Sequence, residues 1–153
     1  MQVDSTTSLR IASERLLDAC AQSDAIESVL LRYVQTLKVQ SALTAASNAH
    51  YELPQRLARW LLMCHDRLDG EQIELTHEFM AMMLAVRRSG VTVTLHTLEG
   101  TGAIRASRGL VTIRDRDRLH EIAGPSYGGA EAEYARLIAP FGKTPHGGET
   151  ARA

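Results

Sequence analysis

The chain has 153 residues, 44% of them hydrophobic, which is enough for one compact domain plus an extended element. Its 17 Lys and Arg nearly balance 18 Asp and Glu, and a net charge of −1 argues against a protein that binds polyanions over its whole surface. No apolar run approaches the ~20 residues of a membrane span. The first residues, MQVDSTTSLR, lack the apolar core of a signal peptide, so we expect a cytoplasmic protein without membrane contact.

Residue patterns typical of catalysis or metal binding are missing from the sequence. Cys20 and Cys64 lie far apart and belong to no CxxC pair, so we expect small buried side chains rather than a disulfide or a zinc site. The histidines show neither HxxxH nor HExxH spacing, and no phosphate loop, nucleophile elbow or framed carboxylate pair occurs. We therefore predict no enzyme, no catalytic residue, no metal and no cofactor. A redox or metal enzyme would need Cys64 and His65 to meet further ligands in space.

A long helix is predicted from Asp24 to about Asn48, a stretch that contains neither Gly nor Pro. Asp24 and Glu27 have the spacing of a capping box. Steps of four and three residues, as in a heptad repeat, then separate Ile26, Leu30, Tyr33, Leu37, Gln40 and Thr44. This pattern favours a helix that pairs with its symmetry mate through Ile26, Leu30, Tyr33 and Leu37. Three heptads are too few to exclude a helix packed only within its own chain.

The next segment, residues 51–68, predicts a core helix. Pro54 suits a first helical turn, and one apolar stripe follows at Leu57, Trp60, Leu61, Cys64 and Leu68. Trp60 is the only tryptophan, and we expect it in the core. Asp69 and Gly70 then predict a turn, and residues 73–75 a short strand.

Two short helices joined by a tight turn are predicted between Thr76 and Ile104, which is the layout of a helix-turn-helix. Thr76 is a suitable N-cap, and the first helix has an apolar face at Phe79, Met80, Met83 and Leu84. After a break at residues 85–86, the second helix opens with Arg87, Arg88 and Ser89 and buries Val91, Leu95 and Leu98. Cationic and hydroxyl side chains at this position suit DNA phosphates and base edges. The alternative is an ordinary helical hairpin with two exposed arginines.

Two short strands, residues 103–106 and 110–114, follow and flank a basic tip of Ser107, Arg108 and Gly109. A helix-turn-helix followed by such a hairpin is a winged helix. Between residues 87 and 118, seven arginines against Glu99, Asp115 and Asp117 give a local charge of +4. A local basic face on a neutral chain is typical of one DNA-contacting edge. A solvated surface hairpin is the other interpretation.

Three segments together resemble the C-terminal half of Crp/Fnr-type transcriptional regulators: RLARWLLMCHDRL, LTHEFMAMMLAVRRSGVTV and GAIRASRGLVTIRDRDRL. The likeness runs from about Ser8 to Ala123 and also includes the long helix. It implies a homodimer that places two recognition helices in successive major grooves of a roughly palindromic double-stranded DNA site. RNA polymerase is a further candidate partner.

The resemblance also implies individual contacts. Its base-contacting positions fall on Arg88, Ser89 and Thr92, and Val93 stands where many relatives carry a longer polar side chain. The contacts expected on the DNA backbone are those of Thr76, Arg87, Ser107 and Arg108. Ala85 occupies a turn position where glycine is common. Gly90 either weakens the recognition helix or lets its backbone approach DNA closely.

The expected fold is mainly α, a long dimerisation helix followed by a winged helix-turn-helix domain with a small β-hairpin wing. Residues 1–23 are predicted to be a remnant of a sensory-domain edge, with 8–23 similar to the last strand and exit helix of the family's sensory barrel. Residues 24–50 form the dimerisation helix and 51–124 the DNA-binding domain. Residues 125–153 form a partly disordered tail with one helix in AEAEYARLIAPF. No cassette for a cyclic nucleotide, haem or iron–sulfur cluster is recognisable.

The predicted function is therefore a sequence-specific transcriptional regulator that lacks its own effector-sensing domain. The alternative is an interaction protein that forms heterodimers with full-length relatives. In that case the long helix carries the function, and Gly90 and Ala85 signal decay of the DNA-binding unit.

Overall fold

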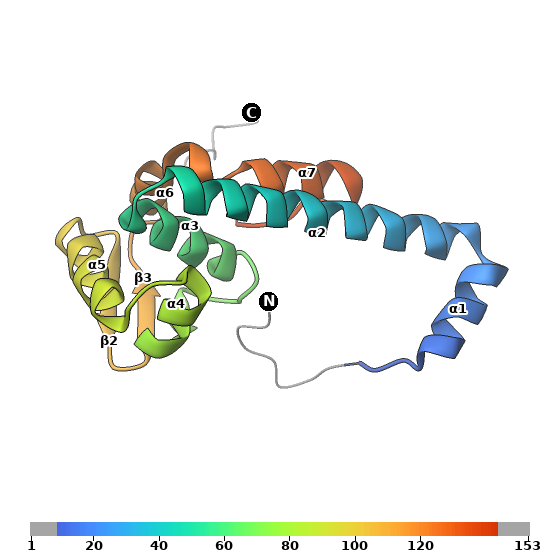
Figure 1. The fold of residues 1–153 in the computed structure, drawn as a ribbon, viewed down its shortest axis with the longest axis horizontal. Helices are drawn as coiled ribbons and strands as arrows, with labels where there is room; N and C mark the ends of the chain where they lie inside the picture. Colours follow the sequence, from blue (N-terminus) through green and yellow to red (C-terminus); the bar gives the residue numbers. More distant parts are fainter. Residues whose placement is uncertain (1–8, 144–153) are drawn as a thin grey trace, which may run out of the picture.

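A computed structural model describes residues 9–143 and confirms a mainly helical fold with a small antiparallel sheet (Figure 1). The long helix α2 and the short α1 project from a compact body built around α3. In chain order the elements are α1 (Ser13–Gln22), α2 (Asp24–His50), α3 (Leu53–His65), β1 (Gln72–Glu74), α4 (His77–Leu84), α5 (Arg88–Gly100), β2 (Ile104–Ser107), β3 (Leu110–Ile113), α6 (Arg116–Ala123), the 3₁₀ turn η1 (Gly124–Ser126) and α7 (Gly129–Leu137).

The sheet confirms the predicted hairpin and its extra strand. Its order is β1-β3-β2, with both pairs antiparallel, so the strand after α3 pairs with the second strand of the hairpin. Gly109 stands at the hairpin tip with φ +76°, a conformation that glycine adopts without strain. The observed strands differ from the predicted bounds by about one residue.

The core forms around α3, which has all nine residues from Leu57 to His65 buried. Trp60 is 5% exposed and packs its ring at a centroid distance of 6.0 Å from Phe79 of α4, as a core anchor should. Cys64 is fully buried, as predicted, whereas Cys20 on α1 is only partly buried. Since α3 ends at His65, Leu68 lies beyond the helix and packs against the core from the following turn.

Three arginines connect the compact body to α2, and we call this set the arginine ladder. Their guanidinium groups donate to side chains spaced one turn apart on α2: Arg56 to Asn48 (3.0 Å), Arg59 to Thr44 (3.2 Å) and Arg67 to Gln40 (3.1 Å). Gln40 and Thr44 were expected to continue the heptad seam. In the single chain both side chains accept hydrogen bonds from arginines of the compact body.

Two features near the N-terminus also differ from the sequence-based expectation, namely the start of α2 and the segment before α1. The predicted capping box at Asp24 and Glu27 is wrong: Ser23 is the N-cap residue, its side chain makes no capping bond, and Asp24 already lies inside α2. The strand expected before α1 is also not found in residues 9–12, which have no regular structure.

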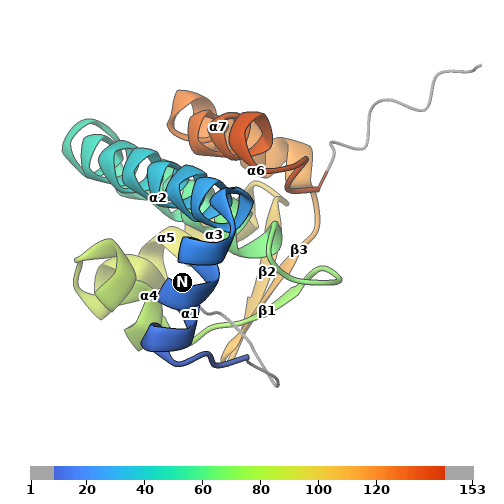
Figure 2. The ribbon, with the colours of Figure 1, turned by 90° about the vertical axis from the view of Figure 1, so that its right-hand side faces the viewer.

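The predicted tail helix packs against α2 of its own chain, as both views show (Figures 1 and 2). This is α7, and at its start a Cβ on Gly129 would lie only 3.2 Å from Leu43. Beyond the helix, Phe141 stacks on Tyr134 at 4.7 Å and accepts the Arg67 guanidinium over its ring. The disorder expected in residues 144–153 lies outside the described residues.

A buried polar cluster closes the end of α3. The His65 side chain is 1% exposed; its Nδ1 accepts from Arg116 at 2.9 Å, and its Nε2 lies 2.8 Å from Glu71 Oε2 and 2.7 Å from Lys143 Nζ. Because arginine has only donors, this arrangement requires a neutral imidazole. Burial and the neighbouring charge of Lys143 lower the pKa of His65.

The free energy of unfolding should therefore fall as the pH drops below about 6.5. In that range the unfolded chain takes up a proton on His65, while the folded chain resists it. Urea unfolding at pH 7.5 and 5.5 measures the difference, which should shrink in His65→Gln and persist in the exposed control His96→Gln. An unchanged pH dependence in His65→Gln would contradict the assignment.

Ala85 closes α4 in the left-handed conformation, with φ +52° and ψ 48°, and is the one non-glycine residue of the described part with positive φ. Ala85→Gly should raise the free energy of unfolding by about 0.5–1 kcal/mol, because glycine relieves the Cβ strain. Ala42→Gly, on an exposed position within α2, should lower it by about the same amount. Thermal and urea unfolding compare the two variants, and a loss of stability in both would show that Ala85 is unstrained.

Candidate nucleic-acid interface

The helix-turn-helix forms at α4 and α5 as predicted. Thr76 caps α4, with its hydroxyl accepting from the Phe79 backbone N–H at 3.2 Å. Arg87 takes the N-cap position of α5, and Val91, Leu95 and Leu98 of α5 are buried, which leaves its other side exposed. Packing of this apolar face against the core thus holds α5 at the surface of the domain.

Gly90 faces inward, toward the start of α3. A Cβ built on it would lie 3.4 Å from Leu53 Cδ2, so the neighbour at this point of α5 is its own chain. The packing therefore does not support the interpretation in which Gly90 lets the helix backbone approach DNA closely.

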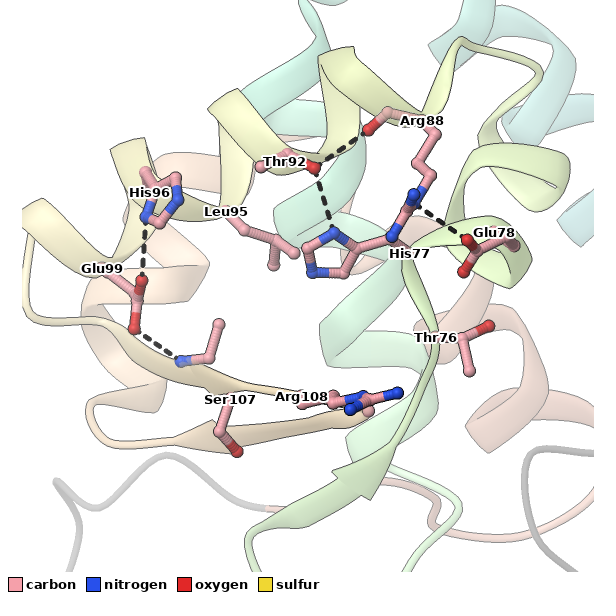
Figure 3. A pocket seen from close by; sticks show the side chains of 12 residues that line it. Thr76, His77, Glu78, Arg88, Thr92, Leu95, His96, Glu99, Ser107 and Arg108 are labelled. Carbon is pink, nitrogen blue, oxygen red and sulfur yellow. Dashed lines mark hydrogen bonds and ion pairs between the residues drawn. The ribbon is translucent and has the colours of Figure 1, made fainter.

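A groove of about 740 Å³ separates α5 from the wing, the β2–β3 hairpin (Figure 3). It brings together five of the seven residues predicted to contact DNA: Thr76, Arg88, Thr92, Ser107 and Arg108. The other two, Arg87 and Ser89, lie exposed at the start of α5 outside the groove lining. The first turn of α5 and the wing tip thus share one hollow.

Arg88 forms an ion pair across the helix-turn-helix. Its Nε donates to Glu78 Oε1 at 2.9 Å, and the two side chains are 67% and 64% exposed. An exposed pair of this kind contributes little to stability, because water screens both charges. Arg88 is therefore held in the groove (Figure 3) by a contact that a stronger acceptor can replace.

Thr92 is bound more firmly to its own domain. Its hydroxyl lies 3.0 Å from His77 Nδ1 and donates to the Arg88 carbonyl at 3.2 Å. Both hydrogen bonds are visible in Figure 3. The hydroxyl thus already has a donor and an acceptor partner.

Glu99 fixes the wing relative to α5. Its Oε1 accepts from the Ala106 backbone N–H at 2.7 Å, and its Oε2 lies 3.3 Å from His96 Nδ1. The wing tip has a second anchor, because the Leu75 backbone N–H donates to the Gly109 carbonyl at 2.9 Å. The wing is therefore held by a side chain of α5 and by the backbone of the residue that follows β1.

The basic stretch is less uniform than its sequence indicates. Arg116 is only 10% exposed and pairs with Asp66 at 2.7 Å, and Arg118 pairs with Glu121 at 2.7 Å. Asp115 caps α6 by accepting from the Arg118 backbone N–H. Two arginines of the stretch thus pair with acidic residues outside it, and the other five are all exposed: Arg87, Arg88, Arg105, Arg108 and Arg114.

Sequence reasoning missed four titratable residues of the groove lining, namely His77, Glu78, His96 and Glu99. His77 and Glu78 directly follow the N-cap residue Thr76, so the sequence could have placed them beside the predicted DNA contact at Thr76. Across residues 9–143 the structure contains no group of three His, Cys, Asp or Glu able to hold a metal ion. Within the same range, no helix has the length and apolar character needed to cross a membrane.

Comparison with known proteins agrees with this geometry. Residues 55–122 match the family model of the Crp-like helix-turn-helix domain, which covers α3 to α6 and the wing. A comparison with curated proteins finds no significant match.

Solved structures with the same fold include regulators from thermophilic bacteria. A CRP-family transcriptional regulator from Thermus thermophilus has 27% identity and a TM-score of 0.51, over 57% of this chain and 48% of that one. A CRP/FNR-family transcriptional regulator from the same organism has 24% identity and a TM-score of 0.52, over 56% and 47%. A CooA mutant from Carboxydothermus hydrogenoformans has 18% identity and a TM-score of 0.62, over 72% and 55%. The last two show the fold alone.

The chain matches about half the length of each of these solved chains. Within that half, residues 55–122 are similar to the Crp-like helix-turn-helix domain.

Proposed function

We propose that the chain, with its Crp-like helix-turn-helix domain at residues 55–122, regulates transcription by binding double-stranded DNA as a homodimer. The observation that carries the proposal is the groove between α5 and the wing. It combines Arg88 and Thr92 of the second helix with Ser107 and Arg108 of the wing on one exposed surface. A winged helix needs this arrangement to place one element in the major groove and the other on the adjacent backbone.

Each predicted contact has a place in this mode of binding. Arg88 and Ser89, in the first turn of α5, reach base edges, and Thr92 follows one turn later on the groove side. Arg88 is suited to the two acceptors of a guanine edge, O6 and N7, once it leaves Glu78. The backbone phosphates are contacted from both sides of the groove by Thr76, Arg87, Ser107 and Arg108.

The proposed dimer rests on the exposed apolar side chains of α2. The predicted seam residues remain 36–44% exposed in the single chain: Ile26, Leu30, Tyr33 and Leu37. Tyr33 and Leu37 also line a small cavity with Tyr134 and Phe141 of the same chain, so the stripe runs beside α7 at this end. Exposed apolar side chains on a projecting helix mark an interaction surface. In our proposal, α2 of a second copy packs against this surface. The resulting dimer presents its two α5 helices to half-sites about one DNA turn apart.

Selection from a randomised double-stranded DNA pool at two salt concentrations tests the function. The purified chain, without an added effector, should enrich a two-fold-related motif with half-sites about one helical turn apart. Weak binding that vanishes with salt and enriches no motif would overturn the proposal and favour a heterodimer with another regulator.

Substitutions of two arginines should then separate base contacts from phosphate contacts. On the selected site, Arg88→Ala should cost about 1–3 kcal/mol and relax specificity at one base pair per half-site. Arg108→Ala should weaken binding to all sequences alike and flatten the salt dependence. Titration of selected and scrambled DNA measures both effects, with Arg136→Ala on α7 as a distant control. Equal losses on every sequence from both groove variants would contradict the assigned roles.

Leu30→Asp should convert the dimer into a monomer, because it places a charge in the centre of the apolar seam. The matched control is Leu31→Asp, which lies about 100° around the same helix and off the heptad positions. Sedimentation equilibrium gives the mass of each variant, and circular dichroism checks that the helices persist. A dimeric Leu30→Asp protein would show that copies associate elsewhere.

A further inference from the structure

Val93 is the large apolar side chain that α5 exposes most. It is 66% exposed, in contrast to Val91, Leu95 and Leu98 of the same helix, which are buried against the core. Since this exposure gives no stability to the single chain, the side chain is free for a contact outside it.

Helix geometry places Val93 in the centre of the outward side. It follows Ser89 by one turn, and residues 96 and 97, which come next on that side, are also exposed. The Thr97 hydroxyl donates back to the Val93 carbonyl at 3.1 Å, so its polar atom is turned toward the helix. Thr92 lies on the neighbouring groove side, with its hydroxyl already bound to His77 and to the Arg88 carbonyl.

We propose that Val93 recognises the 5-methyl group of a thymine in the major groove and thereby determines specificity at one position of each half-site. The inference rests on the proposed function, in which the outward side of α5 faces base edges. Among the groups that bases present in the major groove, the thymine methyl is the apolar one. Against a cytosine or adenine amino group, the valine would remove a donor from water without providing an acceptor.

The stiffness of the side chain favours such a contact. A valine in a helix has one strongly preferred rotamer, so its two methyl groups keep a fixed position relative to the backbone. Ser89 on the same ridge can bind either a donor or an acceptor, so it adds affinity with little selectivity. Val93 therefore complements Arg88, which selects guanine, by selecting a different base.

Deoxyuridine tests this contact, because it differs from thymidine only in lacking the methyl group. Each thymine of the selected half-site is replaced in turn, in both half-sites together, and affinities are measured for the dimer. At one position the wild-type protein should lose about threefold per half-site, and so about tenfold in total. Val93→Ala should bind the thymine and uracil versions of that position equally, whereas Ser89→Ala should keep the wild-type ratio.

A second arm restores the methyl on another base. At the same position, a change from thymine to cytosine should weaken wild-type binding, and 5-methylcytosine should recover part of the loss. The recovery should vanish in Val93→Ala. Circular dichroism and the dimer mass confirm that the variant is folded.

The outcomes separate the two proposals. A selected motif in which no thymine shows a Val93-dependent loss overturns this inference and leaves the proposed function standing. Failure to select any motif overturns the proposed function and the inference with it.

Discussion

The arginine ladder, formed by two residues of α3 and one of the following turn, is the constraint that sets how α2 lies on the compact body. The ladder and α7 together hold α2 against the compact body. Its central rung, Arg59, is 4% exposed and donates also to the Ser126 carbonyl at 2.8 Å, so burial of the charge is offset by hydrogen bonds at both ends. Arg56 continues from Asn48 to the Leu84 carbonyl, where the helix-turn-helix turns. One side chain thus connects the proposed dimer helix to the end of α4, at the turn of the helix-turn-helix.

A few interactions are enough to position the two walls of the groove, α5 and the wing, once the core has formed. Buried residues of α5 fix the helix, Glu99 attaches the wing, and the backbone bond from Leu75 to Gly109 holds the wing tip. The side chains that face the groove are joined mainly by exposed contacts such as Arg88 with Glu78. A rigid scaffold with loosely held contact groups suits a surface that must adjust to a ligand.

The elements that the sequence predicts well are those determined within one or two turns of chain. The Thr76 cap, the apolar face of α5 and the glycine at the hairpin tip each depend on neighbours a few residues away. Contacts between distant segments could not be foreseen. Gln40 and Thr44 continue a heptad in sequence, yet they bind Arg67 and Arg59, which stand 27 and 15 residues further along. In the same way, Arg116 belongs by sequence to a basic run, but it is buried because Asp66 meets it in space.

The position of Glu78 has a consequence for how such a protein would find its target among many competing sites. In the proposed function, a carboxylate at the rim of the interface would repel the phosphates of random DNA and retain Arg88, so the protein would dissociate quickly from such sites. A base edge with two well-placed acceptors would draw the guanidinium away and prolong the complex. The acidic side chain would thus shorten the time spent on wrong sequences more than it weakens binding to the right one, which is discrimination through repulsion.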